Sequence, residues 1–355
     1  SAALSAVSLV DSINVLLIQA FSALAAGGAI VCAQYIGQKN YERANMSARQ
    51  VLFIITAISV AVSAICLIFQ KLLLRLIFGA VEADVMRASE TYFFYTALSF
   101  PFIAAYDSAA SIFRAQDNTK GPMLISMISN VMNIGGNAIL IWVFHMGVAG
   151  AAISTLVSRI FCAVVVLYQL RKDRQPIVVR DYLKIRPDWA MIRRILGLGI
   201  PSGIENSMFQ LGKLAIQSTV STLGTAAIAA QAMTNILENL NGIAAIGVGV
   251  GLMTIVGQCL GAGRKDEAVY YIKKLCVIAE VVIIVSCLTV YALARPVTIL
   301  GGMEKTSAAM CIHMVTWITI VKPLVWTMAF VPGYGLRAAG DVKFSMITSC
   351  CTMWA

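Results

Sequence analysis

Four polar side chains recur along one otherwise apolar stretch of this sequence. They are Asn206, Gln210, Lys213 and Gln217, at positions i, i+4, i+7 and i+11. At 100° per residue of an α-helix they fall within about 60° of one another, and Glu205 borders the face that they form. A charge inside a bilayer costs about 3 kcal/mol or more and is typical of an ion or substrate pathway. The face therefore indicates a pathway for a polar ligand, with Glu205 as a candidate for binding a coupling ion.

Two further stretches place polar residues on one face of an expected helix. Asn130, Asn133 and Asn137 form the first face, and Asn235 and Glu238 belong to the second. Two explanations stay open for the amides: they line a water-filled cavity, or they hydrogen-bond neighbouring helices together. For Glu238 a coupling role and a position near the outer end of its helix are both open.

Isolated charges within other apolar segments extend this set of candidates. Asp107 and Lys322 are two such charges. A water-filled cavity between two lobes accounts best for polar faces in both halves of the chain. The expected ion-coupling residues are Glu205, Asp107 and Glu238. The expected cavity residues are Asn130, Asn133, Asn137, Asn206, Gln210, Lys213, Gln217, Asn235 and Lys322.

Signatures of enzymes and of metal sites are absent from the sequence. It contains no HExxH, GxSxG or Walker A pattern. The nine cysteines show no CxxC spacing, and there are only two histidines. We therefore expect no catalytic residues, no metal and no cofactor other than a coupling ion. An intramembrane enzyme would need a paired catalytic constellation that the sequence does not show.

The composition identifies the elements that must position these residues. Hydrophobic residues make up 59% of the 355 positions and charged residues 12%, against about 25% charged in soluble domains. Uncharged runs of about 20 residues, enough to cross a bilayer as a helix, recur along the chain. We predict an all-α polytopic membrane protein, monomeric, with the lipid bilayer as its surroundings. The predicted segments are 13–37, 48–70, 91–113, 121–143, 148–170, 195–222, 226–260, 274–294, 309–332 and 343–355.

Positive charge is distributed unequally between alternate loops. The loops after the first, third, fifth, seventh and ninth segments hold 19 Lys and Arg residues, and the opposite set holds five. The positive-inside rule makes the first set cytoplasmic. The formal net charge of +10 is thus a topology signal, and we expect no nucleic-acid partner.

The sequences at the ends of two predicted segments occur a second time later in the chain. "VCAQYIGQKNYERA" (31–44) matches "TIVGQCLGAGRKDEA" (254–268) at an offset of 224, and "RAQDNTK" (114–120) matches "RAAGDVK" (337–343) at 223. Both pairs fall on the predicted cytoplasmic side, which indicates two parallel six-helix repeats forming two lobes. We expect about ten of twelve helices, with the first helix and the C-terminal end of the repeat pair missing. The expected parts are an N-terminal lobe at 1–170, a cytoplasmic linker at 171–194 and a C-terminal lobe at 195–355.

The order of these motifs resembles the MATE (multidrug and toxic compound extrusion) transporter family, throughout the chain. The stretches behind the resemblance are "AFSALAAGGAIVCAQYIGQKNYERA", "IFRAQDNTKGPMLISMISNVMNIGGNAILIW", "GIPSGIENSMFQLGKLAIQ" and "GYGLRAAGDVK". The resemblance implies a plasma-membrane exporter of small organic, often cationic, compounds. It implies antiport against Na⁺ or H⁺ by alternating access between two lobes.

The family's coupling sites transfer only in part. One proposed proton site uses an aspartate in the family's first helix, which this chain lacks, and a carboxylate where Asn137 stands. The family's sodium site places an acid where Phe209 stands, about one turn after Glu205. The corresponding tenth helix has no acid here and carries Lys322. The resemblance therefore leaves the choice between Na⁺ and H⁺ open.

A lipid-linked oligosaccharide or lipid flippase of the same superfamily is the alternative function. A flippase cavity should be strongly cationic, because it must hold diphosphates. The candidate residues here include Lys213 and Lys322 but also Glu205, Glu238 and Asp107. This mixture of charges favours drug-like organic substrates.

Overall fold

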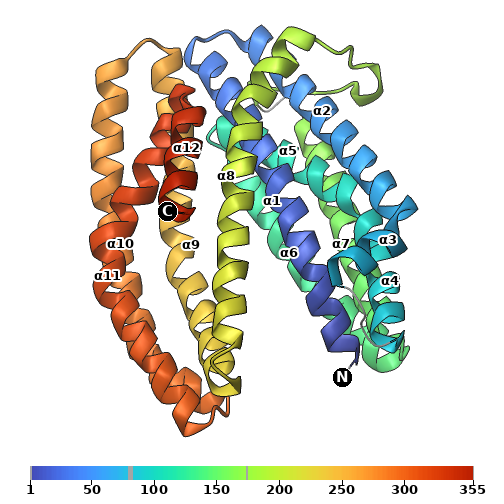
Figure 1. Ribbon diagram of the computed structural model, residues 1–355. Helices are drawn as coiled ribbons and strands as arrows, with labels where there is room; N and C mark the ends of the chain where they lie inside the picture. The colour runs from blue at the N-terminus through green and yellow to red at the C-terminus, as the bar shows by residue number, and fades with distance from the viewer. Residues whose placement is uncertain (1, 79–82, 173–174, 355) are drawn as a thin grey trace. The chain divides into compact units, whose positions relative to one another are not determined.

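The computed structural model describes residues 2–78, 83–172 and 175–354, and in this part of the chain all regular elements are helices, without a strand (Figure 1). Helices α1–α7 span Ala2–Gly37, Tyr41–Ile68, Gln70–Phe78, Ala83–Leu98, Phe100–Ala115, Lys120–Ala138 and Gly147–Leu170, with a π-helix at Ile139–Val143 after α6 and a 3₁₀ turn at Tyr182–Lys184. Helices α8–α12 span Trp189–Ser221, Thr225–Gly261, Lys265–Leu300, Lys305–Ala339 and Val342–Trp354.

The predicted all-α membrane fold is confirmed. Within the described residues, seven helical spans are long and apolar enough to cross a membrane, with mean hydropathies between 1.5 and 2.8. The third predicted segment, 91–113, is divided in the structure between α4 and α5. Ser99 stands at this break, and Pro101 lies in the first turn of α5, where it has no backbone N–H to donate to the turn before it.

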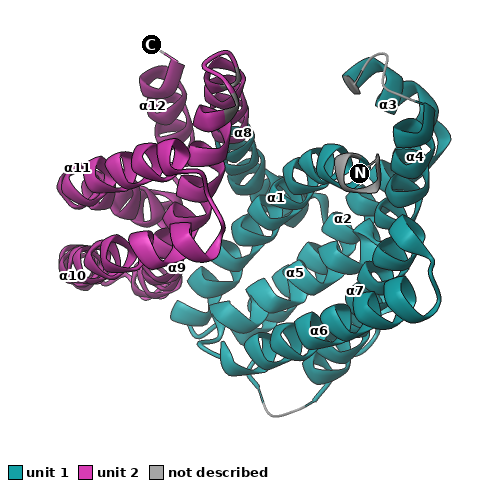
Figure 2. Ribbon diagram, turned by 90° about the horizontal axis from the view of Figure 1, so that it is seen from below, with its two compact units in different colours: residues 1–207 teal, residues 208–355 magenta. Residues whose placement is uncertain are grey.

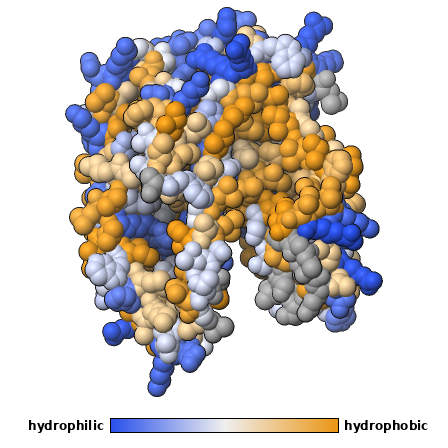
Figure 3. Space-filling view, in the orientation of Figure 1, coloured by the Kyte–Doolittle hydropathy of each residue, from blue (hydrophilic) through white to orange (hydrophobic). Residues whose placement is uncertain are grey.

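The side chains on the outside of the helices are largely apolar, as a lipid environment requires. Trp142 is 76% exposed, Leu324 75% and Met328 74%. In Figure 3 apolar side chains cover the flanks of the helices that face the viewer, and hydrophilic ones gather towards their ends. Large apolar side chains exposed in such numbers would be an aggregation hazard in water. They indicate contact with lipid.

Contacts divide the chain into two compact units, residues 1–207 and 208–355, and the boundary lies inside α8 (Figure 2). The predicted parts at 1–170, 171–194 and 195–355 describe sequence repeats, and they stay a prediction. In unit 2, α9, α10 and α11 pack on one another, and α12 packs against α11. Buried residues such as Leu237, Val290 and Val315 lie between them.

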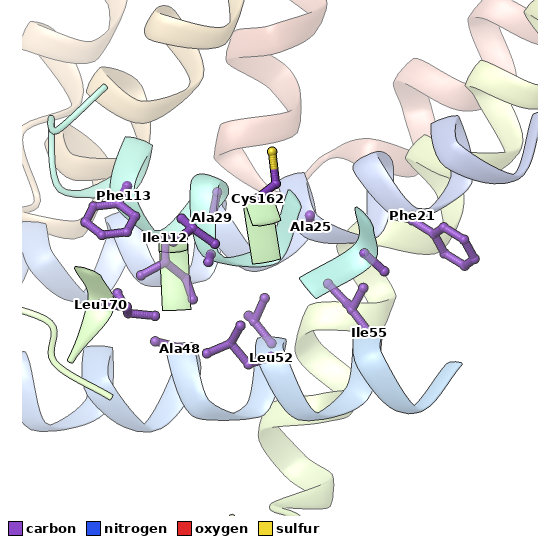
Figure 4. Close-up of a cluster of buried hydrophobic side chains, with 14 of the residues drawn as sticks. Phe21, Ala25, Ala29, Ala48, Leu52, Ile55, Ile112, Phe113, Cys162 and Leu170 are labelled. Carbon is purple, nitrogen blue, oxygen red and sulfur yellow. The ribbon is translucent and has the colours of Figure 1, made fainter. Parts of the chain in front are cut away.

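The core of unit 1 lies where α1, α2, α5 and α7 meet. Figure 4 shows Ile55, Phe113 and Leu170 within a cluster that also contains many alanines, among them Ala29 and Ala48. All five are at most 5% exposed. Small residues let helix backbones approach closely, and this close packing drives helix association in membranes, where lipid is as apolar as the side chains.

Helices α1 and α8 approach most closely at a pair of glycines in unit 1. A Cβ placed on Gly27 would lie 2.6 Å from the backbone nitrogen of Gly199, and one placed on Gly199 would lie 2.9 Å from Cα of Leu24. Real Cβ atoms essentially never come so close. Glycine is therefore required at both positions for this crossing.

The segment after α7, which the sequence shows as a long polar linker, is bonded to unit 1. Asn45 of α2 accepts the backbone N–H of Val178 at 2.8 Å, and Gln50 accepts that of Asp188 at 3.0 Å. Gln50 also donates to the carbonyl of Arg186 at 2.8 Å. Ile177 is fully buried. We call residues 175–188 the strap.

The strap is also fixed at its 3₁₀ turn. The hydroxyl of Tyr182 donates to the carbonyl of Leu167 in α7 at 2.6 Å. Burial raises the pKa of Tyr182 to about 12, although the positive charge of Arg171 acts in the opposite direction. The hydroxyl therefore keeps the proton that it donates throughout the physiological pH range.

Candidate functional site

The predicted polar face of α8 is shared between the two units. Glu205 is buried, with 9% of its surface exposed, and it makes an interaction with another group. Asn206 and Gln210 are half-buried, and Lys213 and Gln217 are exposed. Because the unit boundary follows Ser207, only the last three of the five belong to unit 2.

Unit 2 brings together two charges that the sequence placed on separate helices. Nζ of Lys322 on α11 lies 3.8 Å from Oε1 of Glu238 on α9. The lysine side chain is 7% exposed and the glutamate side chain 40%. Gly242, one turn after Glu238, lies beside the amine: a Cβ there would be 3.9 Å from Nζ, which is ordinary van der Waals contact. The lysine is therefore the buried member of the pair, and the carboxylate is the member that remains accessible from outside.

Aromatic rings surround this ion pair. Nζ of Lys322 lies 5.8 Å from the ring centre of Trp326, which stacks on Phe330 with centroids 5.0 Å apart. Phe330 meets Phe209 of α8 edge to face at 6.0 Å. Nζ of Lys213 lies over Phe209 at 5.0 Å. We call Phe209, Lys213, Glu238, Lys322, Trp326 and Phe330 the aromatic–lysine array.

Helical spacing positions the members of this array. Lys322, Trp326 and Phe330 follow one another at i, i+4 and i+8 on α11, and Phe209 and Lys213 are four apart on α8. Such residues lie on one face of a helix. Sequence reasoning had identified Lys213, Glu238 and Lys322 but missed the three aromatic residues. The four-residue spacing from the two lysines was the signal that could have found them.

The array can bind an organic molecule through its rings and its carboxylate. Phe209 is 37% exposed and Phe330 39%, so ring surface is available for stacking with a planar compound. Trp326 and Phe209 already lie beside lysine amines, the arrangement of a cation–π contact. Glu238 supplies the negative charge.

A buried amide on α9, the helix that also carries Glu238, bonds to the neighbouring helix α10. Asn241 of α9 donates to Sγ of Cys287 on α10 at 3.0 Å, and it is 1% exposed. Lys322 lies within electrostatic range of the same cysteine. Asn235, predicted as a cavity residue on α9, is exposed in the structure.

The asparagines of α6 lie in unit 1 and join two helices. Nδ2 of Asn133 donates to Oγ1 of Thr155 on α7 at 3.2 Å, and Nδ2 of Asn137 donates to Oδ1 of Asn133 at 3.3 Å. Asn130 is exposed. These contacts correspond to the bonding role that the sequence left open, and they do not test the cavity role.

Asp107 also lies in unit 1, on α5, and is half-buried. It lies within electrostatic range of Arg114 on its own helix and of Arg159 on α7. Nη1 of Arg159 donates to Oγ of Ser99 at the break between α4 and α5, at 2.7 Å. The charges of unit 1 thus form a separate group from the array of unit 2.

The described residues hold no group of three or more His, Cys, Asp or Glu side chains that could bind a metal ion. The polar groups that the helices do bring together are carboxylates, amides, hydroxyls and amines. These groups suit reversible binding of small molecules and monovalent cations.

The chain matches the sequence pattern of the MatE family over residues 1–139 and 201–355. It is 26% identical to "Probable multidrug resistance protein YoeA" of Bacillus subtilis (strain 168), over 99% of this chain and 77% of that protein. It is also 26% identical to "Probable multidrug resistance protein NorM" of Thermotoga maritima, over 70% of this chain and 53% of that protein.

A solved structure has the same fold. A multidrug resistance MATE family transporter of the MOP superfamily, in its outward-facing conformation, superposes with a TM-score of 0.91 at 18% identity. The match covers 98% of this chain and 77% of that one. With the family pattern extending over most of its residues and this fold, the chain belongs to the MatE family of multi-pass membrane transporters.

Proposed function

We propose that this chain exports small organic compounds in exchange for Na⁺ or H⁺ by alternating access. The observation that carries this proposal is the Glu238–Lys322 pair, at 3.8 Å, within the aromatic–lysine array of a membrane-spanning unit. Family membership supports the transport activity. The related proteins YoeA and NorM are named as probable multidrug resistance proteins.

The array supplies one carboxylate for which several cations compete. Lys322 is the internal competitor, and it is held close to Glu238 by the burial of its own stem. A proton, a sodium ion or a cationic substrate that takes the carboxylate must displace the amine. Because all of these cations bind the same carboxylate, the ion and the substrate cannot bind at the same time. Antiport requires such mutually exclusive binding.

Displacement of Lys322 from Glu238 also favours a change in the conformation of unit 2. An amine that is 7% exposed and loses its partner is an unpaired buried charge, which is strongly unfavourable. A rearrangement that hydrates or re-pairs the amine is then favoured. Ligand binding shifts an equilibrium between two states in this way when it stabilises one state more than the other.

The remaining predicted residues belong to the same proposal. Glu205 and Asp107 stay candidates for ion coupling in unit 1, alongside Glu238 in unit 2. The amides of α6 and α8, with Asn235 and Lys322, stay candidates for lining a substrate pathway. The chain is proposed to act in the plasma membrane.

The test is efflux from proteoliposomes that contain the purified chain and a fluorescent organic cation. A sodium or proton gradient is imposed, and the initial rate of efflux is measured. We expect wild-type efflux to depend on one of the two gradients. In Glu238→Gln the initial rate should fall at least about tenfold, which corresponds to about 1.4 kcal/mol.

Glu280→Gln is the matched control. Glu280 is a half-buried carboxylate on α10 of the same unit, outside the array. We expect it to transport at nearly the wild-type rate. Wild-type rates and an unchanged gradient dependence in Glu238→Gln would show that the array does not couple transport.

A further inference from the structure

One side of α10 in unit 2 carries a tyrosine and a lysine followed by a continuous apolar stripe. The side chains at i, i+4, i+7, i+11, i+15 and i+18 fall within about 80° of one another around the helix. They are Tyr270, Lys274, Val277, Val281, Val285 and Leu288, which we call the α10 face. The tyrosine and the four aliphatic side chains are 54–65% exposed. Ile272, on the opposite side of α10, packs against Gly335 of α11, so the α10 face is turned away from that helix.

The amine of Lys274 is held on the ring of Tyr270. Its Nζ donates to the phenol oxygen at 3.0 Å and lies 5.3 Å from the ring centre. Tyr271 meets Tyr270 edge to face, with ring centroids 5.6 Å apart. An ammonium group has three N–H donors, and the phenol oxygen takes one of them. The amine is therefore positioned by a neutral group and keeps donors for an anion.

The charges near Lys274 do not supply that anion. Among the described residues no carboxylate forms an ion pair with Lys274. Asp266 and Glu267 precede it by about 10–12 Å along the helix axis, and Arg264 already pairs with Glu267 at 3.2 Å. Lys273 adds a second exposed amine next to Lys274. This end of the α10 face is thus positively charged.

The length of the apolar stripe matches one leaflet of a bilayer. From Val277 to Leu288 the helix rises by about 16 Å, and half of the hydrocarbon core is about 15 Å thick. The loop before α10 is predicted to be cytoplasmic, so Tyr270 and Lys274 are expected at the level of the cytoplasmic headgroups. Tyrosine prefers this level, because its ring is apolar and its hydroxyl is polar.

We propose that the α10 face binds an anionic phospholipid of the cytoplasmic leaflet. The lipid phosphate would accept hydrogen bonds from Nζ of Lys274 and from the hydroxyl of Tyr270. The acyl chains would lie along the four aliphatic residues of the face. Charge complementarity favours this occupant, because a second copy of the chain would bring the same positive charge, and a zwitterionic lipid carries a cation of its own. Lipid binding at this face does not depend on the proposed transport activity.

The test counts bound lipids directly. The purified chain in detergent is mixed with phosphatidylglycerol or with phosphatidylcholine, and native mass spectrometry measures the fraction of chains that retain lipid at each lipid concentration. We expect the wild-type chain to bind phosphatidylglycerol at least about fivefold more tightly than phosphatidylcholine, the factor typical of one lysine at an anionic surface.

Variants of the two polar residues test the position of the headgroup. Lys274→Gln should weaken phosphatidylglycerol binding by about fivefold and leave phosphatidylcholine binding unchanged. Lys274→Arg should keep the preference, because it keeps the charge, and Tyr270→Phe should reduce it in part. Lys265→Gln is the matched control, since Lys265 is an exposed lysine of α10 on the side opposite to Lys274. Both lysines are exposed, so the melting temperatures of these variants without lipid should equal that of the wild-type chain.

Several outcomes would overturn the lipid site. Equal affinities of the wild-type chain for the two lipids would show that the headgroup charge is not recognised. Wild-type affinity in Lys274→Gln, or an equal loss in Lys265→Gln, would show that Lys274 does not bind the headgroup. Displacement of phosphatidylglycerol by an equal concentration of inorganic phosphate would indicate a site for a free anion. Dimers that form only without bound lipid, and that Lys274→Gln abolishes, would assign the face to a second copy of the chain.

Discussion

At the scale of single residues, the Glu238–Lys322 pair is asymmetric in its exposure. The lysine side chain is 7% exposed and the glutamate side chain 40%. Removing the glutamate leaves a buried amine without its partner, whereas removing the lysine leaves a carboxylate that water can reach. Deleting one partner of a buried pair costs more than replacing both partners by apolar groups. The two single substitutions should therefore differ in their effect on stability.

We predict that Glu238→Gln lowers the free energy of unfolding by about 1–3 kcal/mol, below the full cost for a completely buried pair because the glutamate is partly solvated. Lys322→Met should cost less, and the double variant should recover part of the loss. Thermal unfolding in detergent measures all three. Lys213→Met, at an exposed lysine of the array, serves as control. Equal losses in both single variants would mean that the amine is not the buried member of the pair.

At the scale of helices, the crossing of α1 and α8 depends on Gly27 and Gly199. A methyl group on Gly199 would lie 2.9 Å from backbone Cα of Leu24, an atom that cannot move away independently. Gly197, half a turn earlier on α8, has nothing within 4 Å of the corresponding position. The same substitution should therefore have opposite effects at two neighbouring sites.

We predict that Gly199→Ala destabilises the chain by about 1–3 kcal/mol through overpacking. Gly197→Ala should stabilise it by up to about 1 kcal/mol, because alanine is the better helix former. Melting temperatures of the two variants in one detergent give the comparison. A Gly199→Ala variant as stable as Gly197→Ala would contradict the close contact between the helices.

The strap is a second feature at this scale, because side chains of α2 replace water as partners of its backbone. Asn45 and Gln50 each bond backbone groups of the strap on both their carbonyl and amide sides. A polar segment that is bonded in this way should resist proteases, although its composition is that of an exposed linker. Local opening governs proteolysis when opening and closing are fast.

We predict that Gln50→Ala speeds tryptic cleavage within the strap, at Arg180, Lys184 or Arg186, by about fivefold or more, since two backbone hydrogen bonds of about 1 kcal/mol each are lost. Limited proteolysis followed by mass spectrometry of the fragments measures the rate. Gln38 is an exposed glutamine that directly follows α1. Gln38→Ala should leave the rate of cleavage unchanged. Rapid cleavage of the wild-type strap would show that these hydrogen bonds do not protect its backbone from the protease.

At the scale of the whole molecule, two different boundaries divide the chain. The sequence repeats predict a change of lobe in the polar segment around residues 171–194. The contacts place the boundary between units after Ser207, within α8. The first part of α8 packs on α1 through Gly199, and the strap fixes the preceding segment to α2 and α7. The N-terminal part of α8 therefore belongs physically to unit 1.

The topology of the whole chain gives a further prediction. Single cysteines at Lys39 and Lys120 should react with a membrane-impermeant maleimide from the cytoplasmic side only, and cysteines at Gly147 and Gly302 from the outside only. The native cysteines are replaced first, and labelling of intact cells is compared with that of inverted vesicles. Labelling of Lys120 and Gly147 from the same side would contradict the predicted alternation of the helices.

The sequence by itself determined the class of fold and the places of the long helices, although not all of their ends: α10 begins nine residues before its predicted segment 274–294, and α11 ends seven residues after its predicted segment 309–332. Hydrophobicity that extends over whole segments requires helices in a bilayer, because every backbone group must be bonded within its own segment. The predicted segment 226–260, for example, coincides almost completely with α9. The division of segment 91–113 was missed because the effect of Pro101 on one turn is small beside an unbroken apolar run. The bonded strap was missed because polar composition is also typical of a solvated linker.

Only the tertiary structure decided which candidate residues meet. Glu238 and Lys322 are 84 positions apart, and no pattern within either helix indicates that their side chains lie 3.8 Å from each other. Trp326 and Phe330 were overlooked because aromatic residues at helical spacing usually pack in cores, and their exposure depends on neighbouring helices. Sequence periodicity fixes which residues share a face of one helix, whereas the angles and distances at which helices cross fix which faces meet.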